Sequence, residues 1–249
     1  MNKKIAFFLI ILLSFGASMV WGETIELHGA ASTVDSLIMP YKDAVEKKTG
    51  HSLMVVKSNA GNGLIDLVEG KCDASLASAS IEVVVKAAKA AGKEVDASKL
   101  VLTVAATDEV VFIVNTNNPV STLTWEQLRD IHTGKIINWK DVGGRDEPIL
   151  VYTDAAASAT RGLIKQVVME NQEYTANAKT LGFVAEVNDM VAGHVNAIGG
   201  LGKGFANPQI MKILRTKKLE RPLGFITIGE PVGATKQVID AFRTKVMRQ

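Results

Sequence analysis

Four short segments of the sequence combine hydroxyl, amide and small residues in a way that suits the binding of an anion. Each lies at the start of a stretch with helical periodicity, where unpaired backbone N–H groups and the positive end of the helix dipole attract negative groups. Serine or threonine at such a place also caps the helix. The four segments together, rather than any single one, therefore predict a shared oxyanion site: Ala31-Ser32-Thr33, Gly61-Asn62-Gly63, Ser78-Ala79-Ser80 and Ser158-Ala159-Thr160.

The elements that position these segments alternate between short β-branched strands and amphipathic helices, which predicts an α/β fold with a mostly parallel sheet. In an open sheet of this kind, turns gather at the carboxyl ends of the strands, where ligands bind. The sequence shows no internal repeat and no proline-rich linker, so any lobes are expected to be joined by strands. The expected strands cover residues 25–27, 53–56, 74–77, 100–105, 110–114, 149–152, 197–200 and 223–228.

Three local patterns refine this organisation. Pro40 should kink or interrupt the helix that follows the first turn. Thr124 and Gln127 fit a capping box, in which the threonine caps a helix and the glutamine side chain reaches back. The adjacent acids Asp108 and Glu109 are expected to be solvated, or hydrogen-bonded near a hinge, rather than to act as acid–base groups.

The N-terminus predicts a secretory signal peptide, residues 1–22, with cleavage near Gly22 and a periplasmic mature protein. A basic start at Lys3 and Lys4 precedes an apolar run and then small residues. A membrane anchor is the alternative, but the run barely reaches the roughly 18 to 20 apolar residues that a membrane-spanning helix needs. The single cysteine, Cys72, lies far from the cleavage point, which excludes lipid attachment at a new N-terminal cysteine.

Composition and charge exclude several other classes of function. Removal of Lys3 and Lys4 from the 28 basic residues leaves 26, against 26 acidic residues, so the mature chain is neutral. A neutral chain with scattered charges has no footprint for nucleic acid or anionic lipid. An aromatic content of 6% argues against stacking platforms for sugars or bases. The four histidines show no metal-ligand spacing, no cofactor is implied, and we expect a monomer.

Several segments, in the same order along the chain, resemble one known family. Residues 29–33 resemble its opening Gly-Ala-Gly-Ala/Ser-Thr turn, residues 58–63 its Ser- and Gly-rich second turn, and residues 73–78 its Asp-x-Gly-x-Ala-Ser segment. Residues 131–139, Ile-His-Thr-Gly-Lys-Ile-Ile-Asn-Trp, are close to its Ile-Phe-x-Gly-Lys-Ile-x-Asn-Trp motif. The chain therefore resembles the phosphate-binding protein family of ABC transporters, a branch of the type II periplasmic binding proteins.

This resemblance implies two α/β lobes joined by crossover strands, with residues 23–105 and 203–249 in one lobe and residues 106–202 in the other. A cleft between the lobes would hold phosphate or a related small oxyanion and deliver it to the permease of an ABC transporter. The lobes would close on the ligand by hinge bending. Together with the four turns, the resemblance assigns ligand contacts to Ala31, Ser32, Thr33, Ser58, Asn59, Gly61, Ser78, Asp154, Ser158, Ala159 and Thr160.

The fourth turn departs from the family pattern. The family usually reads Arg-x-x-Gly-Ser-Gly-Thr there, and its arginine pairs with the bound oxyanion. This chain has Asp154 in the arginine position and alanine in place of both glycines. A carboxylate repels phosphate, and alanine restricts a backbone that should approach the ligand closely. Arg161 could substitute only by reaching back, and we expect it to lie on the helix surface instead.

Three alternatives stay open or are weighed at this point. The same fold could hold a zwitterionic or neutral polar solute, with Asp154 pairing with an ammonium group or accepting a hydrogen bond from a protonated oxyanion. The chain could also be a sensory or scaffold derivative that has lost its ligand. An enzyme that uses Ser158 is disfavoured, because the sequence offers no nucleophile elbow, no Ser-x-x-Lys motif at that serine and no assignable base.

Overall fold

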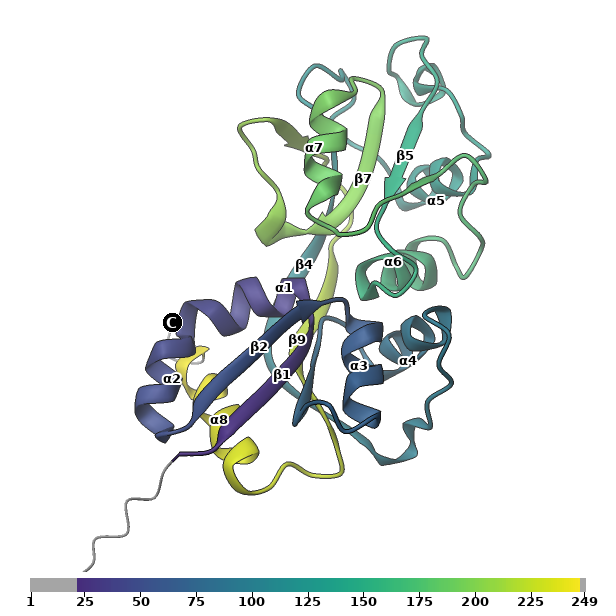
Figure 1. Ribbon diagram of the computed structural model, residues 1–249. Helices are drawn as coiled ribbons and strands as arrows, with labels where there is room; N and C mark the ends of the chain where they lie inside the picture. The colour runs from purple at the N-terminus through teal and green to yellow at the C-terminus, as the bar shows by residue number, and fades with distance from the viewer. Residues whose placement is uncertain (1–21, 247–249) are drawn as a thin grey trace, which may run out of the picture.

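The alternation of strands and helices folds into two α/β lobes that share one sheet, in a computed structural model that describes residues 22–246 (Figure 1). Within these residues the strands follow the order β2-β1-β3-β9-β4-β7-β5-β6, and β8 pairs with β4 outside this path. The strands are β1 (Thr24–Ala30), β2 (Ser52–Ser58), β3 (Ala74–Ala77), β4 (Leu100–Asn115), β5 (Leu150–Thr153), β6 (Lys179–Thr180), β7 (Ala197–Gly202), β8 (Met211–Ile213) and β9 (Leu219–Ile228).

The helices cover both faces of the sheet. In the first lobe, α2 and α8 lie on one face and α3 and α4 on the other; in the second lobe, α7 lies opposite α5 and α6 (Figure 1). This arrangement buries apolar side chains on both faces, as a sheet covered by helices requires. The α-helices are α1 (Ala31–Thr33), α2 (Lys42–Thr49), α3 (Ala60–Val68), α4 (Ile81–Ala90), α5 (Trp125–Thr133), α6 (Ala159–Leu163), α7 (Glu186–Gly193) and α8 (Gly233–Val246).

Each lobe contains a parallel set of three strands. In the first lobe β1 pairs in parallel with β2 and with β3, and in the second lobe β5 pairs in parallel with β7 and with β6. The antiparallel pairs all involve β4 or β9, which connect the lobes. The predicted α/β class with a two-lobed arrangement is therefore confirmed.

Strands β4 and β9 lie side by side between the lobes and connect them (Figure 1), and this pair is called the hinge below after the role that the resemblance implies. Two separate strands were expected at 100–105 and 110–114, but β4 is continuous over 16 residues. The polar residues between those stretches stay in the strand because they are paired across it. Asp108 lies opposite Arg221 in the register, and Glu109 forms an ion pair with Lys203 at 2.9 Å. A register shift between Val104 and Ala106 marks a bulge in the hinge.

The limits of the two lobes remain a prediction, and strand pairing refines it. The expected first lobe included all residues after 203, yet β8 pairs with the second-lobe end of β4 at residues 113–115. The indole of Trp125 also donates to the Lys217 carbonyl at 3.2 Å. We therefore propose that the chain returns to the first lobe along β9 rather than near residue 203.

Local predictions around the helix ends agree with the structure. Thr124 and Gln127 form both hydrogen bonds of the capping box at the start of α5. The helical stretch around Pro40 is interrupted, because a π-helical segment (Val34–Ile38) and a 3-10 turn (Met39–Tyr41) precede α2. The predicted signal peptide lies outside the described residues, apart from Gly22. Between residues 22 and 246, no helix has the length and apolar character needed to cross a membrane.

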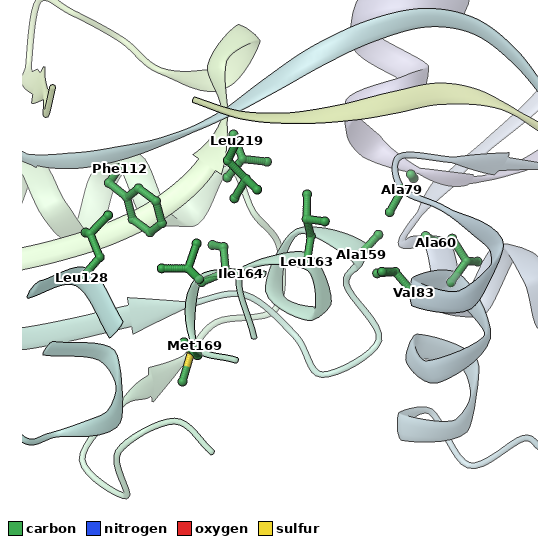
Figure 2. Close-up of a cluster of buried hydrophobic side chains, with 14 of the residues drawn as sticks. Ala60, Ala79, Val83, Phe112, Leu128, Ala159, Leu163, Ile164, Met169 and Leu219 are labelled. Carbon is green, nitrogen blue, oxygen red and sulfur yellow. The ribbon is translucent and has the colours of Figure 1, made fainter. Parts of the chain in front are cut away.

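Hydrophobic packing continues from one lobe to the other. One buried cluster includes Ala60 and Val83 from α3 and α4 as well as Ala159 and Leu163 from α6 (Figure 2). A Cβ atom at Gly162 would lie 3.1 Å from the Val83 side chain, so α4 and α6 approach closely there. The lobes thus meet through small apolar side chains beside the cleft, which holds the cleft walls near each other.

Candidate functional site

A small cavity lies between the lobes, at the carboxyl ends of four strands. Strands β1, β2, β3 and β5 end at or just before residues that line it. Its volume is about 20 Å³, which is close to what one water molecule needs. The structure brings nine of the eleven predicted contact residues to this cavity: Ala31, Ser32, Ser58, Asn59, Ser78, Asp154, Ser158, Ala159 and Thr160.

The other two predicted residues do not line the cavity. The Thr33 hydroxyl is buried and donates to the Ala77 carbonyl at 2.7 Å, which ties α1 to β3. The Gly61 N–H donates to the Ala157 carbonyl at 3.0 Å, a hydrogen bond from one lobe to the other. A Cβ atom at Gly61 would lie 2.7 Å from the Ala87 backbone, so this glycine lets α3 pack against α4. Both positions therefore serve the fold around the cavity.

Helix capping accounts for some of the polar lining residues, as the sequence left open. The Asn59 side chain accepts from the Asn62 N–H at 3.0 Å at the start of α3. The Ser158 hydroxyl oxygen accepts from the Thr160 N–H at 3.1 Å at the start of α6. Ser32 makes no such cap hydrogen bond to its own helix. Asn59 and Ser158 thus cap a helix and also line the cavity, whereas the Ser32 hydroxyl accepts a hydrogen bond from Arg221 instead.

Asp154 is the only ionisable side chain among the residues that line the cavity. It is 2% exposed, and burial raises its pKa to about 6, although the Ser158 hydroxyl and the charges of Arg161 and Arg221 oppose the rise. The Ser158 hydroxyl donates to the Asp154 carboxylate. Near neutral pH the carboxyl is therefore mostly ionised, and it gains a proton in mildly acid solution.

Arg161 does not replace the missing arginine in the cavity. Its Nη1 donates to the Asp154 carbonyl oxygen and to the Thr180 hydroxyl, both at 3.2 Å. Its guanidinium also lies over the Tyr174 ring, 4.6 Å from the ring centre. These contacts hold Arg161 against β6 and the loop before it, and the residue is absent from the cavity lining. Its charge reaches Asp154 only through space.

Sequence reasoning missed a buried ion pair behind the cavity. Arg221, on β9, donates from Nε and Nη2 to one carboxylate oxygen of Asp108 at 3.0 and 2.7 Å. The same guanidinium donates to the Ser32 hydroxyl at 2.9 Å and to the Thr160 hydroxyl at 2.7 Å. Asp108 thus has the hinge hydrogen-bonding role expected of it. The available signal was a pair of charged residues inside each of two mostly apolar strands, Asp108 and Glu109 in β4 and Glu220 and Arg221 in β9.

A loop at the cavity rim was also missed. Gly182, Phe183 and Val184 line the cavity from the segment before α7. The Glu186 carboxylate accepts from the Gly182 and Phe183 N–H groups at 2.9 and 3.2 Å, which fixes the loop. Phe183 is 56% exposed. The segment carries no strand-to-helix turn of the kind used for the prediction, so no signal pointed to it.

The two lobes, the two strands that join them and the cavity between them define a protein of the two-lobed α/β class. The chain belongs to the PBP superfamily domain family, whose model matches residues 23–240. It is 25% identical over 179 residues to the phosphate-binding protein PstS of Bacillus subtilis, covering 72% of this chain and 56% of that protein. The chain spans about a third to just over half of the length of the curated relatives it matches.

Solved structures share the fold across different ligands. A putative phosphate ABC transporter substrate-binding protein from Clostridium perfringens, with bound phosphate, has a TM-score of 0.76 and 24% identity, over 90% of this chain and 96% of that one. The effector-binding domain of QuiR in complex with shikimate has a TM-score of 0.67 and 13% identity, over 92% and 99% of the two chains. The fold alone therefore does not fix the ligand.

Proposed function

We propose that the protein is an exported solute-binding protein that binds phosphate or a related small oxyanion and presents it to an ABC transporter permease. The observation that carries the proposal is the convergence of hydroxyl-bearing turns from both lobes on one small cavity. Hydroxyl groups that surround an anion supply many neutral donors, each of which forms a charge-assisted hydrogen bond. The relatives are named as phosphate-binding proteins, which supports the same ligand class.

Asp154 restricts which oxyanion fits. An ionised carboxylate in the cavity lining accepts a hydrogen bond from a ligand that still carries a proton, but it repels a ligand that is fully ionised. Phosphate retains a proton at neutral pH, whereas sulfate does not. We therefore propose that the site favours protonated oxyanions, and that the Asp154 carboxylate accepts a hydrogen bond from the protonated ligand oxygen.

A zwitterionic solute is the second candidate, and a specific observation favours it. Asp154 supplies the single ionisable side chain of the described cavity lining, and it is acidic. A ligand with an ammonium group beside Asp154 and a carboxylate toward the hydroxyls would match that charge. At about 20 Å³ the cavity holds about one water molecule, so either ligand requires the lobes to part, and the smaller oxyanion requires less opening than a zwitterion.

Export, a monomeric state and the absence of catalysis belong to the same proposal. The relatives are named as binding proteins, and the cavity lining in the described residues includes neither histidine nor lysine to act as a base for Ser158. The Ser158 hydroxyl is already engaged with Asp154. N-terminal sequencing of the secreted protein tests cleavage near Gly22, and light scattering tests the monomer.

A thermal-shift screen of the mature protein tests the ligand class. A ligand that binds only the folded state raises the unfolding midpoint by mass action, so phosphate is expected to raise it by several degrees, and sulfate by less. Molybdate, phosphonates and amino acids complete the panel. A shift with amino acids alone would replace the oxyanion proposal with the zwitterionic one. No shift with any member of the panel would contradict both.

A further inference from the structure

The guanidinium of Arg221 lies behind the cavity wall, at the level where the two lobes meet. Arg221 is 1% exposed and is absent from the cavity lining. It reaches one hydroxyl from each lobe, Ser32 of the first and Thr160 of the second, while Asp108 holds it from the neighbouring hinge strand. Because Asp108 and Arg221 are direct partners in the β4–β9 register, the position of the guanidinium is set by the hinge itself.

These contacts decide what the two hydroxyls can do. A serine or threonine hydroxyl has one donor proton and two acceptor lone pairs. In Ser32 and Thr160 the oxygen already accepts an N–H from a charged guanidinium, which cannot accept a proton in return. The hydroxyl protons are therefore free for another acceptor, and both residues line the cavity. A hydrogen bond from a charged donor also polarises the O–H group, which strengthens it as a donor.

We infer that Arg221 is a positioning residue of the ligand site, which fixes Ser32 and Thr160 as hydrogen-bond donors to the ligand and couples the two lobes on which they lie. This inference rests on the proposed function, because it assigns roles within the same site. Position 154 carries an acid instead of a cation, and Asp108 balances the charge of Arg221. Arg221 therefore acts on the ligand through the two hydroxyl groups that it holds and polarises, rather than as a free positive charge.

Gly202 gives independent support, because it makes room for the guanidinium. A Cβ atom at Gly202, on β7, would lie 2.3 Å from Nη2 of Arg221 and 2.9 Å from the Asp108 carboxylate. At these distances a methyl group would force the guanidinium or the carboxylate to shift. The second lobe therefore contributes a glycine at a place where a larger residue would displace Arg221, and Gly202→Ala offers a way to shift the guanidinium while its charge is kept.

The test measures phosphate affinity by isothermal titration calorimetry in the mature protein. Ser32→Ala and Thr160→Ala each remove one donor, and we expect about a 10-fold loss for each. Arg221→Lys keeps a positive charge near Asp108, but a single ammonium group cannot span both hydroxyls, and we expect a loss of about 10- to 100-fold. In the Arg221→Lys background, the combined loss from both alanine substitutions should fall from about 100-fold to about 10-fold or less.

Arg243→Lys serves as a matched control for Arg221→Lys, and Gly202→Ala perturbs the guanidinium in a second way. Arg243→Lys makes the same change at an exposed arginine on α8, which faces Asp240 at 3.9 Å, and it should leave affinity unchanged. Gly202→Ala should weaken phosphate binding by a similar factor to Arg221→Lys, and it serves if the latter does not fold. Wild-type affinity in both Arg221→Lys and Gly202→Ala, or an undiminished loss from Ser32→Ala and Thr160→Ala, would overturn the inference and leave the proposed function intact.

If phosphate does not bind at all, amide hydrogen exchange still tests the role of Arg221 separately from the proposed function. The bridge through Arg221 predicts that Arg221→Lys speeds exchange in both residues 31–33 and residues 158–160, with no ligand present. Faster exchange in both segments supports the bridge even where the proposed ligand is wrong. A response in only one segment, or in neither, overturns the bridge.

Discussion

The first lobe lines the cavity with the hydroxyls of Ser32, Ser58 and Ser78, whereas the second lobe lines it with Ser158, Thr160 and the carboxyl group of Asp154. The first wall therefore carries donors without charge, and the second wall adds the single acid of the lining. The two walls also differ in their relation to the family pattern. The first keeps the polar residues of its segments, although Ala31 and Ser75 stand where the family pattern has glycine, while the second has lost an arginine as well as two glycines. Both lobes therefore supply hydroxyl donors, whereas the carboxylate acceptor of the described lining belongs to the second lobe alone.

The second lobe also contains two buried groups, Asp154 and His132, whose large pKa shifts tie stability to pH in the acid range. Asp154 has a pKa raised to about 6 from an ordinary value of 3.8 by burial. His132, fully buried in α5 between the rings of Phe112 and Tyr174, has a pKa lowered to about 4 from 6.5, also by burial. These two shifts have opposite consequences for the folded state.

The largest effect that we predict is on the free energy of unfolding, which loses the contribution of neutral, buried His132 in acid. Between the ordinary pKa of 6.5 and the folded value of about 4, the unfolded chain binds a proton that the folded chain does not. Stability from this group therefore falls as pH falls through that window, by about 3 kcal/mol in total. His132→Phe, with the residue that the resembled motif has in this position, should remove this loss. Urea unfolding at several pH values measures it.

Asp154 works in the opposite direction over an overlapping window. Its folded pKa is raised, so its contribution is complete below 3.8 and is lost as pH rises through about 6, by about 3 kcal/mol. The contributions of His132 and Asp154 to the free energy of unfolding should thus largely cancel in the wild-type protein between about pH 4 and pH 6. His132→Phe should become more stable as pH falls over that range. If the free energy of unfolding of His132→Phe does not rise as pH falls from about 6 to about 4, burial does not raise the pKa of Asp154 as described.

Asp154→Asn removes the carboxylate by which the second-lobe wall differs from the first. At about pH 8, where the carboxyl group of the wild-type protein is ionised, the variant should bind sulfate about 10-fold more tightly than wild type, because repulsion is removed. Near pH 5, where Asp154 is protonated, the two proteins should differ much less. Calorimetry with sulfate at both pH values measures this. Equal sulfate affinity at about pH 8 would mean that Asp154 does not face the ligand.

The third prediction concerns the contact between the lobes beside the walls. Gly162→Ala places a Cβ atom 3.1 Å from the Val83 side chain, which should push α4 and α6 apart slightly and weaken phosphate binding about 3-fold. Val83→Ala in addition should restore the space and most of the affinity. Thermal unfolding distinguishes this from a folding defect, since alanine favours the helix over glycine. An unrestored double variant would contradict the steric account.

The smallest effect is expected at the exposed rim of the contact between the lobes, beside α4 and α6. The Gln166 side chain donates to the Glu82 carboxylate at 3.1 Å, from the second lobe to the first, in an exposed position. Water competes for such a bond, so Gln166→Ala should change phosphate affinity by less than about 2-fold. A larger loss in calorimetry would show that the exposed rim, rather than the small apolar side chains, holds the walls together.

Much of this organisation could be predicted from the sequence, because strand-to-helix turns have a local signature. β1, β2, β3 and β5 end next to predicted contact residues, and parallel strands bring such ends together without further information. The capping box of Thr124 is equally local. Nine predicted contact residues meet at the cavity for this reason.

The remaining features depend on contacts between distant parts of the chain. Asp108 and Glu109 look like a break between two strands, yet β4 continues because Arg221 and Lys203 pair with them. Arg221 reaches Ser32 across 189 positions of sequence, and no periodicity reports such a contact. Thr33 and Gly61 lie in two of the predicted turns. However, the Thr33 hydroxyl bonds to the Ala77 carbonyl and the Gly61 N–H to the Ala157 carbonyl, and only the packed structure fixes these partners.

The central claim is that donors from both lobes hold a small oxyanion in this cavity, and one titration tests it most directly. Inorganic phosphate is titrated calorimetrically into the mature wild-type protein and into the double variant Ser32→Ala/Thr160→Ala at neutral pH. We predict one phosphate bound per chain in the wild-type protein and an affinity about 100-fold lower in the double variant. Equal phosphate binding by the two proteins would contradict the claim, as would a wild-type protein that binds no phosphate.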